Sequence, residues 1–358
     1  MRPLIPLLGL SLILPACSKA PSDEPTFSEA VHAVYKPCDP DELKLRAASK
    51  GMQLAFEPCG SNNFSWARWS PDGLTLYYQA NQGAWVRRDT GENYPLRIGM
   101  PRSNPAWLNG EMLAYPDSDG RKIGIYQIRS HVLSLVELDV VQPEQLTKGR
   151  GPDEVLFLAA DVPEGNKDVY RFSADTGETE RAFAWLTAGL ETFTYTPQQD
   201  VVCYREFGSE TVQCRKGADG ADVVDVPGRK RGSLSSDGRY LLTEGDGVPV
   251  PVYGDDEVGR ARAAAAPKYI PKEIVPPSFW VRDMVTGKEV TWAGVHGTAF
   301  QWYEAAPYFG AFMLWGFDGV ETNANIPLVD LRSFLKGQGW DVPIGVEAPK
   351  PDHATTMN

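Results

Sequence analysis

The sequence has few of the residues that usually carry out catalysis or bind metals. Its 358 residues include five Cys and four His, and His32, His131, His296 and His353 lie far apart in the chain. It has no Gly-x-Ser-x-Gly, no glycine-rich phosphate loop followed by Lys-Ser/Thr, no His-Glu-x-x-His and no Cys-x-x-Cys. We therefore predict no catalytic residue, no metal site and no cofactor, and we expect the His residues to be structural or on the surface.

Positive charge is also scarce. The chain has 35 Lys and Arg against 47 Asp and Glu, which gives a net charge of −12. Binding to a nucleic acid needs a basic stripe that contacts phosphates, so the charge argues against a nucleic-acid partner.

Long apolar runs and long helical periodicity are absent as well. The apolar run from Leu4 to Leu14 is too short to span a bilayer, and polar residues follow it. With Arg2 before it and Leu14-Pro15-Ala16-Cys17 at its end, it resembles a bacterial lipoprotein signal peptide, although Pro15 departs from the usual small residue. The resemblance implies a signal peptide over 1–16 and lipidation of Cys17. An ordinary secretory signal is the alternative.

The signal also suggests a location. Residues 17–26 would form a flexible tether, and Ser18, in place of Asp, resembles lipoproteins that are sent to an outer membrane. We therefore expect a protein of the bacterial cell envelope, anchored to the membrane through lipidated Cys17, in the outer membrane and facing the periplasm.

Turn residues are plentiful and follow a fixed spacing. The chain has 34 Gly and 29 Pro. Gly91 and Gly177 are separated by two steps of 43, and Gly220 lies one such step further on. Gly287 follows after one more step and an excess of 24. A period in the low forties is typical of β-propeller blades. Further steps reach positions 48, 134 and 330, so seven blades are favoured. Six blades are the alternative, and an irregular β-sandwich is a more distant one.

Within one period the strands can be predicted directly. Residues 64–69 form a first strand, and Ser70-Pro71-Asp72-Gly73 is a tight turn. Residues 74–79, 84–88 and 92–98 form three more strands, so each blade is a four-stranded antiparallel meander. Trp66, Trp69, Trp85, Trp280, Trp302 and Trp315 lie in predicted strands, where we expect them to pack between blades.

The same residues resemble a known repeat. Trp69-Ser70-Pro71-Asp72-Gly73, then an apolar strand, a polar loop such as Pro116-Asp117-Ser118-Asp119-Gly120, an aromatic-bearing strand and a Thr-Gly turn are similar to the repeat of TolB-like propellers, relatives of WD-repeat propellers. The resemblance covers about residues 27–346 and leaves 347–358 as a disordered tail. It implies an all-β propeller that serves as a binding scaffold, although propellers support many unrelated activities.

Cysteine pairing fits an exported protein. Without Cys17, four Cys remain, an even number suited to an oxidising compartment. Cys203 and Cys214 flank a predicted hairpin about Gly208-Ser209 and would lie opposite each other as a hydrogen-bonded pair with Cα atoms near 5.5 Å apart. We predict a disulfide there, and Cys38 with Cys59 by elimination. Free buried thiols are the alternative.

The excess of 24 marks an insertion over 245–277, which is rich in Pro and separates the second strand of its blade from the third. Second-to-third connections share one face of a propeller, opposite the Asp-Gly turns. We expect the insertion to contact a partner there or to be a passive loop. The predicted binding face combines acidic residues of these connections with basic residues of the insertion: Asp117, Asp119, Asp161, Asp168, Asp318, Arg260 and Arg262.

These observations favour a lipid-anchored envelope propeller that binds an envelope protein or peptide without catalysing a reaction. Two alternatives remain. One is a receptor for a small ligand or glycan, which should show exposed aromatic side chains at the channel mouth. The other is a propeller enzyme that uses two carboxylates at that mouth.

Overall fold

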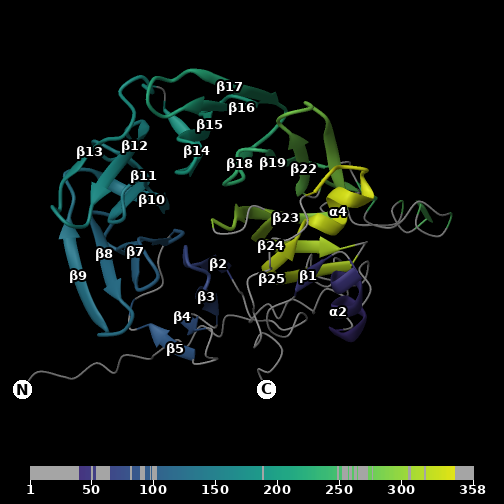
Figure 1. Cartoon of the computed structure of the whole chain (residues 1–358), viewed down its shortest axis with the longest axis horizontal. Coiled ribbons are helices and arrows are strands. Elements are labelled where there is room, and N and C mark those ends of the chain that lie inside the picture. The colour runs from purple at the N-terminus through teal and green to yellow at the C-terminus, as the bar shows by residue number, and fades with distance from the viewer. Residues whose placement is uncertain are drawn as a thin grey trace, which may run out of the picture.

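The computed structural model is a ring of antiparallel sheets around a central axis (Figure 1). It describes residues 40–49, 51–53, 65–80, 83–88, 93–96, 98, 103–187, 189–247, 250–251, 257, 260–261, 264, 273–275, 277–304, 308–317 and 320–342. Four four-stranded sheets follow one another along the chain, and a seven-stranded sheet completes the ring. The predicted all-β propeller of four-stranded blades is confirmed.

The first four blades are meanders whose strands pair in chain order. Blade one has β2 (Ser65–Trp69), β3 (Thr75–Ala80), β4 (Gly83–Arg88) and β5 (Asn93–Leu96), and blade two has β6 (Ala106–Trp107), β7 (Met112–Pro116), β8 (Lys122–Gln127) and β9 (Val132–Glu137). Blade three has β10 (Val141–Lys148), β11 (Glu154–Ala160), β12 (Lys167–Ser173) and β13 (Thr179–Arg181), and blade four has β14 (Leu190–Thr196), β15 (Val201–Glu206), β16 (Thr211–Lys216) and β17 (Asp222–Pro227).

The seven-stranded sheet contains blades five and six, joined by one long strand. Its strands, in order across the sheet, are β1 (Met52–Gln53), β25 (Val320–Asp330), β24 (Phe309–Phe317), β23 (Glu289–Trp302), β22 (Pro277–Asp283), β19 (Tyr240–Asp246) and β18 (Arg231–Leu234). Residues 289–296 of β23 pair with β22, and residues 295–302 pair with β24. One continuous strand is therefore the outermost strand of blade five and the innermost strand of blade six.

The ring is closed by a strand from the amino-terminal part of the chain. Met52 of β1 pairs with Val329 of β25, and the Asp330 N–H donates to the Gly51 carbonyl at 2.8 Å. The first and last marks of the regular spacing, at 48 and 330, therefore belong to the same blade. Counting both gave seven blades, which is wrong. The ring has six, the stated alternative, because blade six takes its outermost strand from the other end of the chain.

The third turn of a blade repeats as the spacing predicts. Gly177, Gly220 and Gly287 all have φ between 71° and 74°. Each donates its N–H to the carbonyl four residues earlier, at 2.8–2.9 Å. This left-handed backbone favours glycine, so the regular Gly positions reflect one turn geometry used in three blades. The mark at 134 lies within β9, and the turn of that blade comes earlier, at His131 with φ 54°.

The first turn of a blade is built by its Asp side chain. Asp72 Oδ1 accepts from the Ser70 hydroxyl at 2.5 Å and from the Leu74 N–H at 3.1 Å. Asp237 makes the corresponding bonds with Ser235, at 2.6 Å, and with the Arg239 N–H, at 3.0 Å. The sequence prediction that Asp72 and Asp237 form turns is confirmed.

Apolar clusters fill the spaces between neighbouring blades. The cluster between blades five and six includes Phe279, Phe300 and Phe309, all almost fully buried. It extends to Ala47 of α2 (Pro40–Ser49) and Leu335 of α4 (Arg332–Gly337), so both helices pack against the outside of the seven-stranded sheet (Figure 1).

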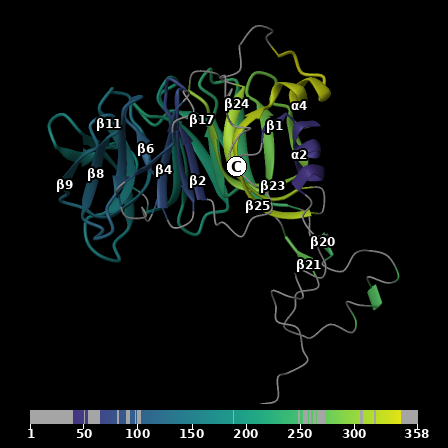
Figure 2. The ribbon, with the colours of Figure 1, turned by 90° about the horizontal axis from the view of Figure 1, so that it is seen from below.

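The insertion leaves the ring between β19 and β22, as predicted. Asp246 and Pro277 are register partners at its base, so the whole of 247–276 separates two positions that face each other in the sheet. Within it, β20 (Val250–Pro251) pairs with β21 (Glu273–Ile274). Figure 2 shows this hairpin standing clear of the disc of blades. The other second-to-third connections are much shorter: 117–121 in blade two, 161–166 in blade three and 207–210 in blade four.

Candidate functional site

A cavity of about 120 Å³ lies on the central axis of the ring. We call it the central cavity. Its lining residues come from the innermost strand of every blade, β2, β6, β10, β14, β18 and β23, and from the first turns that follow those strands. None of the described residues that were predicted for a binding face lines it.

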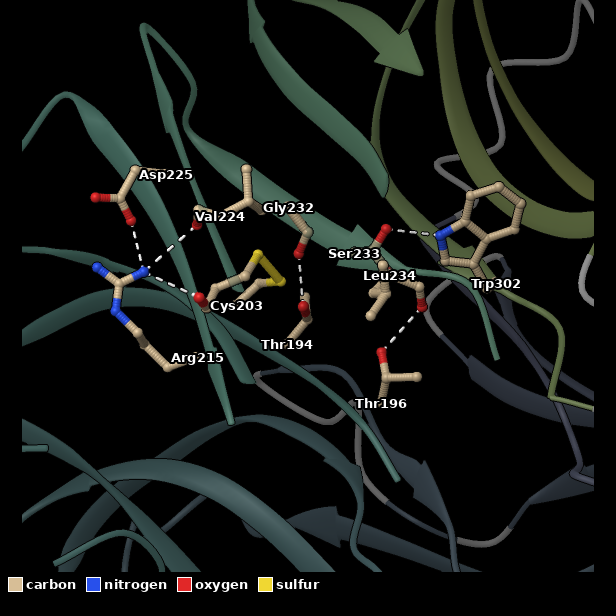
Figure 3. Close-up of a disulfide and its surroundings, with 11 residues drawn as sticks. Thr194, Thr196, Cys203, Arg215, Val224, Asp225, Gly232, Ser233, Leu234 and Trp302 are labelled. Carbon is tan, nitrogen blue, oxygen red and sulfur yellow. Dashed lines mark hydrogen bonds and ion pairs between the residues drawn. A yellow bond between two sulfur atoms is a disulfide. The ribbon is translucent and has the colours of Figure 1, made fainter. Parts of the chain in front are cut away.

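Hydrogen bonds between neighbouring innermost strands fix the wall of the central cavity (Figure 3). Thr194 and Thr196 of β14 donate their hydroxyls to the carbonyls of Gly232 and Leu234 in β18, and the Trp302 indole N–H donates to the Ser233 carbonyl at 2.7 Å. In blade two, the Trp107 indole N–H donates to the Arg68 carbonyl at 2.9 Å. The innermost strands are therefore tied together by side chains, which places the cavity-lining groups on a rigid frame.

Three cationic side chains line the central cavity: Arg68, Arg231 and Lys148. Arg68 is only 7% exposed, and its buried Nε has no hydrogen-bond partner. Burial, together with the nearby charge of Arg231, lowers the pKa of Arg68 to about 9, and Glu244 and Tyr77 oppose that shift. Lys148 donates from Nζ to the Leu108 carbonyl at 2.7 Å.

Glu304 is the one carboxylate among the described residues that line the cavity. It lies at the end of the cavity near the first turns. Burial raises the pKa of Glu304, and Lys148 and a hydrogen bond from Gln198 partly offset the effect. Glu244 lies close behind the wall, where its carboxylate accepts the Phe300 N–H at 2.8 Å. The paired carboxylates that the enzyme alternative requires are not found among the described residues that line this cavity.

Aromatic rings form much of the remaining wall. Trp69, Phe193, Phe300 and Trp302 line the central cavity beside the cations. Trp69 packs edge-on against Tyr303, and Trp302 packs against Phe300 with ring centroids 5.1 Å apart. Trp69 and Trp302 therefore pack between blades, as predicted, and also face the cavity, which the sequence reasoning missed.

Among the predicted acidic binding residues, Asp119 and Asp161 lie in second-to-third connections and Asp168 lies at the start of β12, and all three are engaged within the chain. Asp119 forms an ion pair with Lys122 at 2.8 Å, which lowers the pKa of that carboxyl. Asp161 accepts from Tyr170 and from Arg181, and these bonds lower its pKa. Asp168 lies 3.0 Å from Arg181, and burial raises its pKa. Asp119 is therefore paired within blade two, and Asp161 and Asp168 share Arg181 within blade three.

The remaining predicted face residues are only partly described. Asp117 begins the β7–β8 connection, where its carbonyl accepts the Gly120 N–H at 3.2 Å. Arg260 is exposed within the insertion. Arg262 and Asp318 lie outside the described residues. The predicted face therefore remains a prediction for these positions.

The disulfide between Cys203 and Cys214 is present, as predicted (Figure 3). The two residues are register partners in β15 and β16, and their Cα atoms are 4.0 Å apart. That spacing is closer to a non-hydrogen-bonded pair than to the hydrogen-bonded pair we expected. The hairpin is joined by 207–210, where a two-residue turn was expected, and one extra residue on each side reverses the alternation of the two pair types. Cys17, Cys38 and Cys59 lie outside the described residues.

Neither a cluster of metal ligands nor a membrane-spanning helix occurs among the described residues. Among the described residues no three His, Cys, Asp or Glu side chains come together as a metal site would require. His131 bonds the Tyr126 hydroxyl through Nδ1 at 2.9 Å. No helix in the described part of the chain is long and apolar enough to cross a membrane.

Comparison with known proteins finds solved structures of low identity and low TM-score, and no argument about function rests on them. No protein-family model and no curated protein matches the chain. Among solved structures it is similar to hydrazine synthase from Kuenenia stuttgartiensis, with 12% identity, coverage of 75% of this chain and 80% of that one, and a TM-score of 0.48. A TolB candidate from Agrobacterium tumefaciens has 14% identity, coverage of 65% and 81%, and a TM-score of 0.43. A nidogen/laminin complex has 11% identity, coverage of 65% and 80%, and a TM-score of 0.44. The chain is a six-bladed β-propeller, as its own sheet order and register show.

Proposed function

We propose that this protein is a non-catalytic binding scaffold of the bacterial cell envelope, anchored in the outer membrane through lipidated Cys17 and facing the periplasm. Its propeller would present the blade-five insertion to an envelope protein or peptide. The observation that carries the proposal is the insertion itself. It places the whole of 247–276 between two paired positions, Asp246 and Pro277, whereas the equivalent connections of blades two to four are short loops.

The position of the insertion suits a role in binding. Its base is held rigidly, because β19 and β22 pair without interruption from Tyr240 to Asp246. Near the base, Arg229 stacks over the Trp280 ring at 3.8 Å and forms an ion pair with Glu289 at 2.7 Å. Long connections carried on a rigid scaffold are common sites of recognition. A partner could therefore contact the insertion without any rearrangement of the ring.

Replacing residues 247–276 with an Asn-Gly turn tests this role. Because Asp246 and Pro277 are register partners, a two-residue turn can close the β19–β22 hairpin. We expect the variant to keep the thermal unfolding midpoint of the parent protein and to lose the envelope protein that the parent retains in affinity pull-downs. A matched variant that replaces 207–210 of blade four with Asn-Gly should retain it. An unchanged set of partners in the insertion variant would refute the proposal.

The anchor can be tested separately. We expect Cys17→Ala to abolish incorporation of a labelled fatty acid and to move the protein from the membrane fraction to the soluble fraction, because the acyl chains on Cys17 would supply the membrane affinity. Ser18→Ala keeps Cys17 and should remain labelled and membrane-bound. Fatty-acid labelling of the Cys17→Ala variant would contradict the anchor.

A second candidate function is a receptor for a small ligand. The central cavity supports it, because aromatic and cationic side chains line one enclosed space. This function does not compete with the scaffold role for the same residues, since the insertion contributes no lining residue among those described.

A further inference from the structure

We propose that the central cavity binds a small organic anion, a carboxylate or phosphate with an apolar body, through Arg68 and Arg231. This inference deepens the second candidate function, on which it rests, and does not depend on the scaffold role. The two arginines come from blades on opposite sides of the closing blade six, and both side chains reach the same cavity.

The described lining of the central cavity carries more positive than negative charge. The chain as a whole carries a net charge of −12, yet the described lining residues include Arg68, Arg231 and Lys148 against Glu304 alone. Lys148 lies near Glu304, which leaves the two arginines at the other part of the wall. An acidic protein that concentrates cations along an enclosed axis creates a local field that attracts anions.

The buried guanidinium of Arg68 lacks a partner among the described residues. Arg68 forms no hydrogen bond or ion pair through its side chain with a described residue, and its Nε is buried. Glu244 is close enough to offset part of the cost of the buried charge, but its carboxylate forms no ion pair with Arg68. Burying a cation without a partner is costly, so a stable fold normally pairs such a group. A bound anion would supply the partner.

Further polar atoms without partners in the described part of the chain belong to residues that line the same cavity. Asn104 and Tyr303 also line it, and Asn104 Oδ1 and the Tyr303 hydroxyl are buried without partners. Buried polar atoms are nearly always hydrogen-bonded in native proteins. The Tyr303 hydroxyl lies against Gly73, so Arg68 and Asn104 are the residues of the cavity wall whose hydrogen bonding a polar ligand would complete.

The chemistry of the wall selects the class of anion. A guanidinium presents a planar fork that matches the two oxygens of a carboxylate or phosphate. Trp302, Phe193 and Phe300 line the cavity with the arginines and would contact an apolar or ring-shaped body. The combination fits an organic anion better than a simple inorganic ion, and an aromatic carboxylate is a suitable probe.

The test titrates the purified protein with benzoate, with its neutral isostere benzamide and with inorganic phosphate, at constant ionic strength. Binding is followed by calorimetry and by the indole N–H signals of Trp302 and Trp107 in NMR spectra. We expect benzoate to bind, phosphate to bind more weakly and benzamide not to bind. Because a hydrogen bond to a charged group is lost, Arg68→Met should weaken the binding roughly tenfold or more. Arg129→Met, on an exposed arginine paired with Glu111, should not change it.

Stability provides the second readout. Without ligand, Arg68→Met should keep or raise the unfolding midpoint, because it removes a buried cation that has no partner among the described residues. If Arg68→Met does not fold, Arg231→Met takes its place in the same titration. The proposal is overturned if benzoate does not bind the parent protein, if phosphate or benzamide binds as tightly as benzoate, or if the arginine variants bind benzoate with unchanged affinity.

Discussion

Deleting residues 1–53 is expected to leave the ring less stable, by about 3 kcal/mol or more, than deleting residues 1–39 does. Both deletions remove Cys38, so the predicted Cys38–Cys59 disulfide does not contribute to the difference. The longer deletion removes β1, the outermost strand of blade six, and with it Met52, which is 3% exposed within the largest apolar cluster. Loss of a buried Met side chain alone costs about 2–5 kcal/mol when it leaves a cavity. Urea unfolding followed by tryptophan fluorescence measures the difference.

A point substitution separates packing from chain length. Met52→Ala keeps the strand and should lower the free energy of unfolding by about 2 kcal/mol or more. Leu45→Ala, on the exposed side of α2, is the matched control and should change it little. If the two deletions unfold at the same urea concentration, β1 does not close the ring.

Loss of the Cys203–Cys214 disulfide is the second large effect that we expect. Replacing both residues with Ala should lower the free energy of unfolding by about 2–4 kcal/mol, because the crosslink restricts the unfolded chain over a separation of 11 residues and both residues lie in the apolar cluster between blades four and five. The measurement is urea unfolding of a parent protein that carries Cys38→Ser and Cys59→Ser, so that a single disulfide can respond to reductant.

Adding a reductant to both proteins provides the control for this experiment. The Cys38→Ser/Cys59→Ser protein should lose stability when dithiothreitol is added, and the version that also lacks Cys203 and Cys214 should not respond. A Cys38→Ser/Cys59→Ser protein that unfolds at the same urea concentration with and without reductant would show that the crosslink does not contribute.

The features predicted correctly from the sequence are those encoded by local backbone geometry. Gly177, Gly220 and Gly287 occupy the same left-handed turn, so their spacing reported the period of the blades. Asp72 and Asp237 build the same first turn from neighbouring residues. The Cys203–Cys214 pair lies in one hairpin. Each of these features depends on residues that are close together in the chain.

The errors arose where distant parts of the chain meet. The blade count failed because β1 and β25, which lie near opposite ends of the sequence, share one blade. The central cavity was missed because it takes its lining from one strand of every blade, and no local pattern brings Arg68 and Arg231 together. One signal was available. Polar residues such as Arg68 and Ser233 stand two positions before the Ser of the Ser-x-Asp-Gly turns, on the strand that faces the axis.

Site-specific photo-crosslinking in cells tests the scaffold role most directly. A photoreactive residue at Val275, 47% exposed at the end of the insertion, would be compared with the same residue at Val285, 80% exposed in the turn at the opposite end of β22. The account predicts a discrete adduct with an envelope protein from position 275 and none from position 285. Equal adducts from both positions, or an adduct from 285 alone, would contradict it.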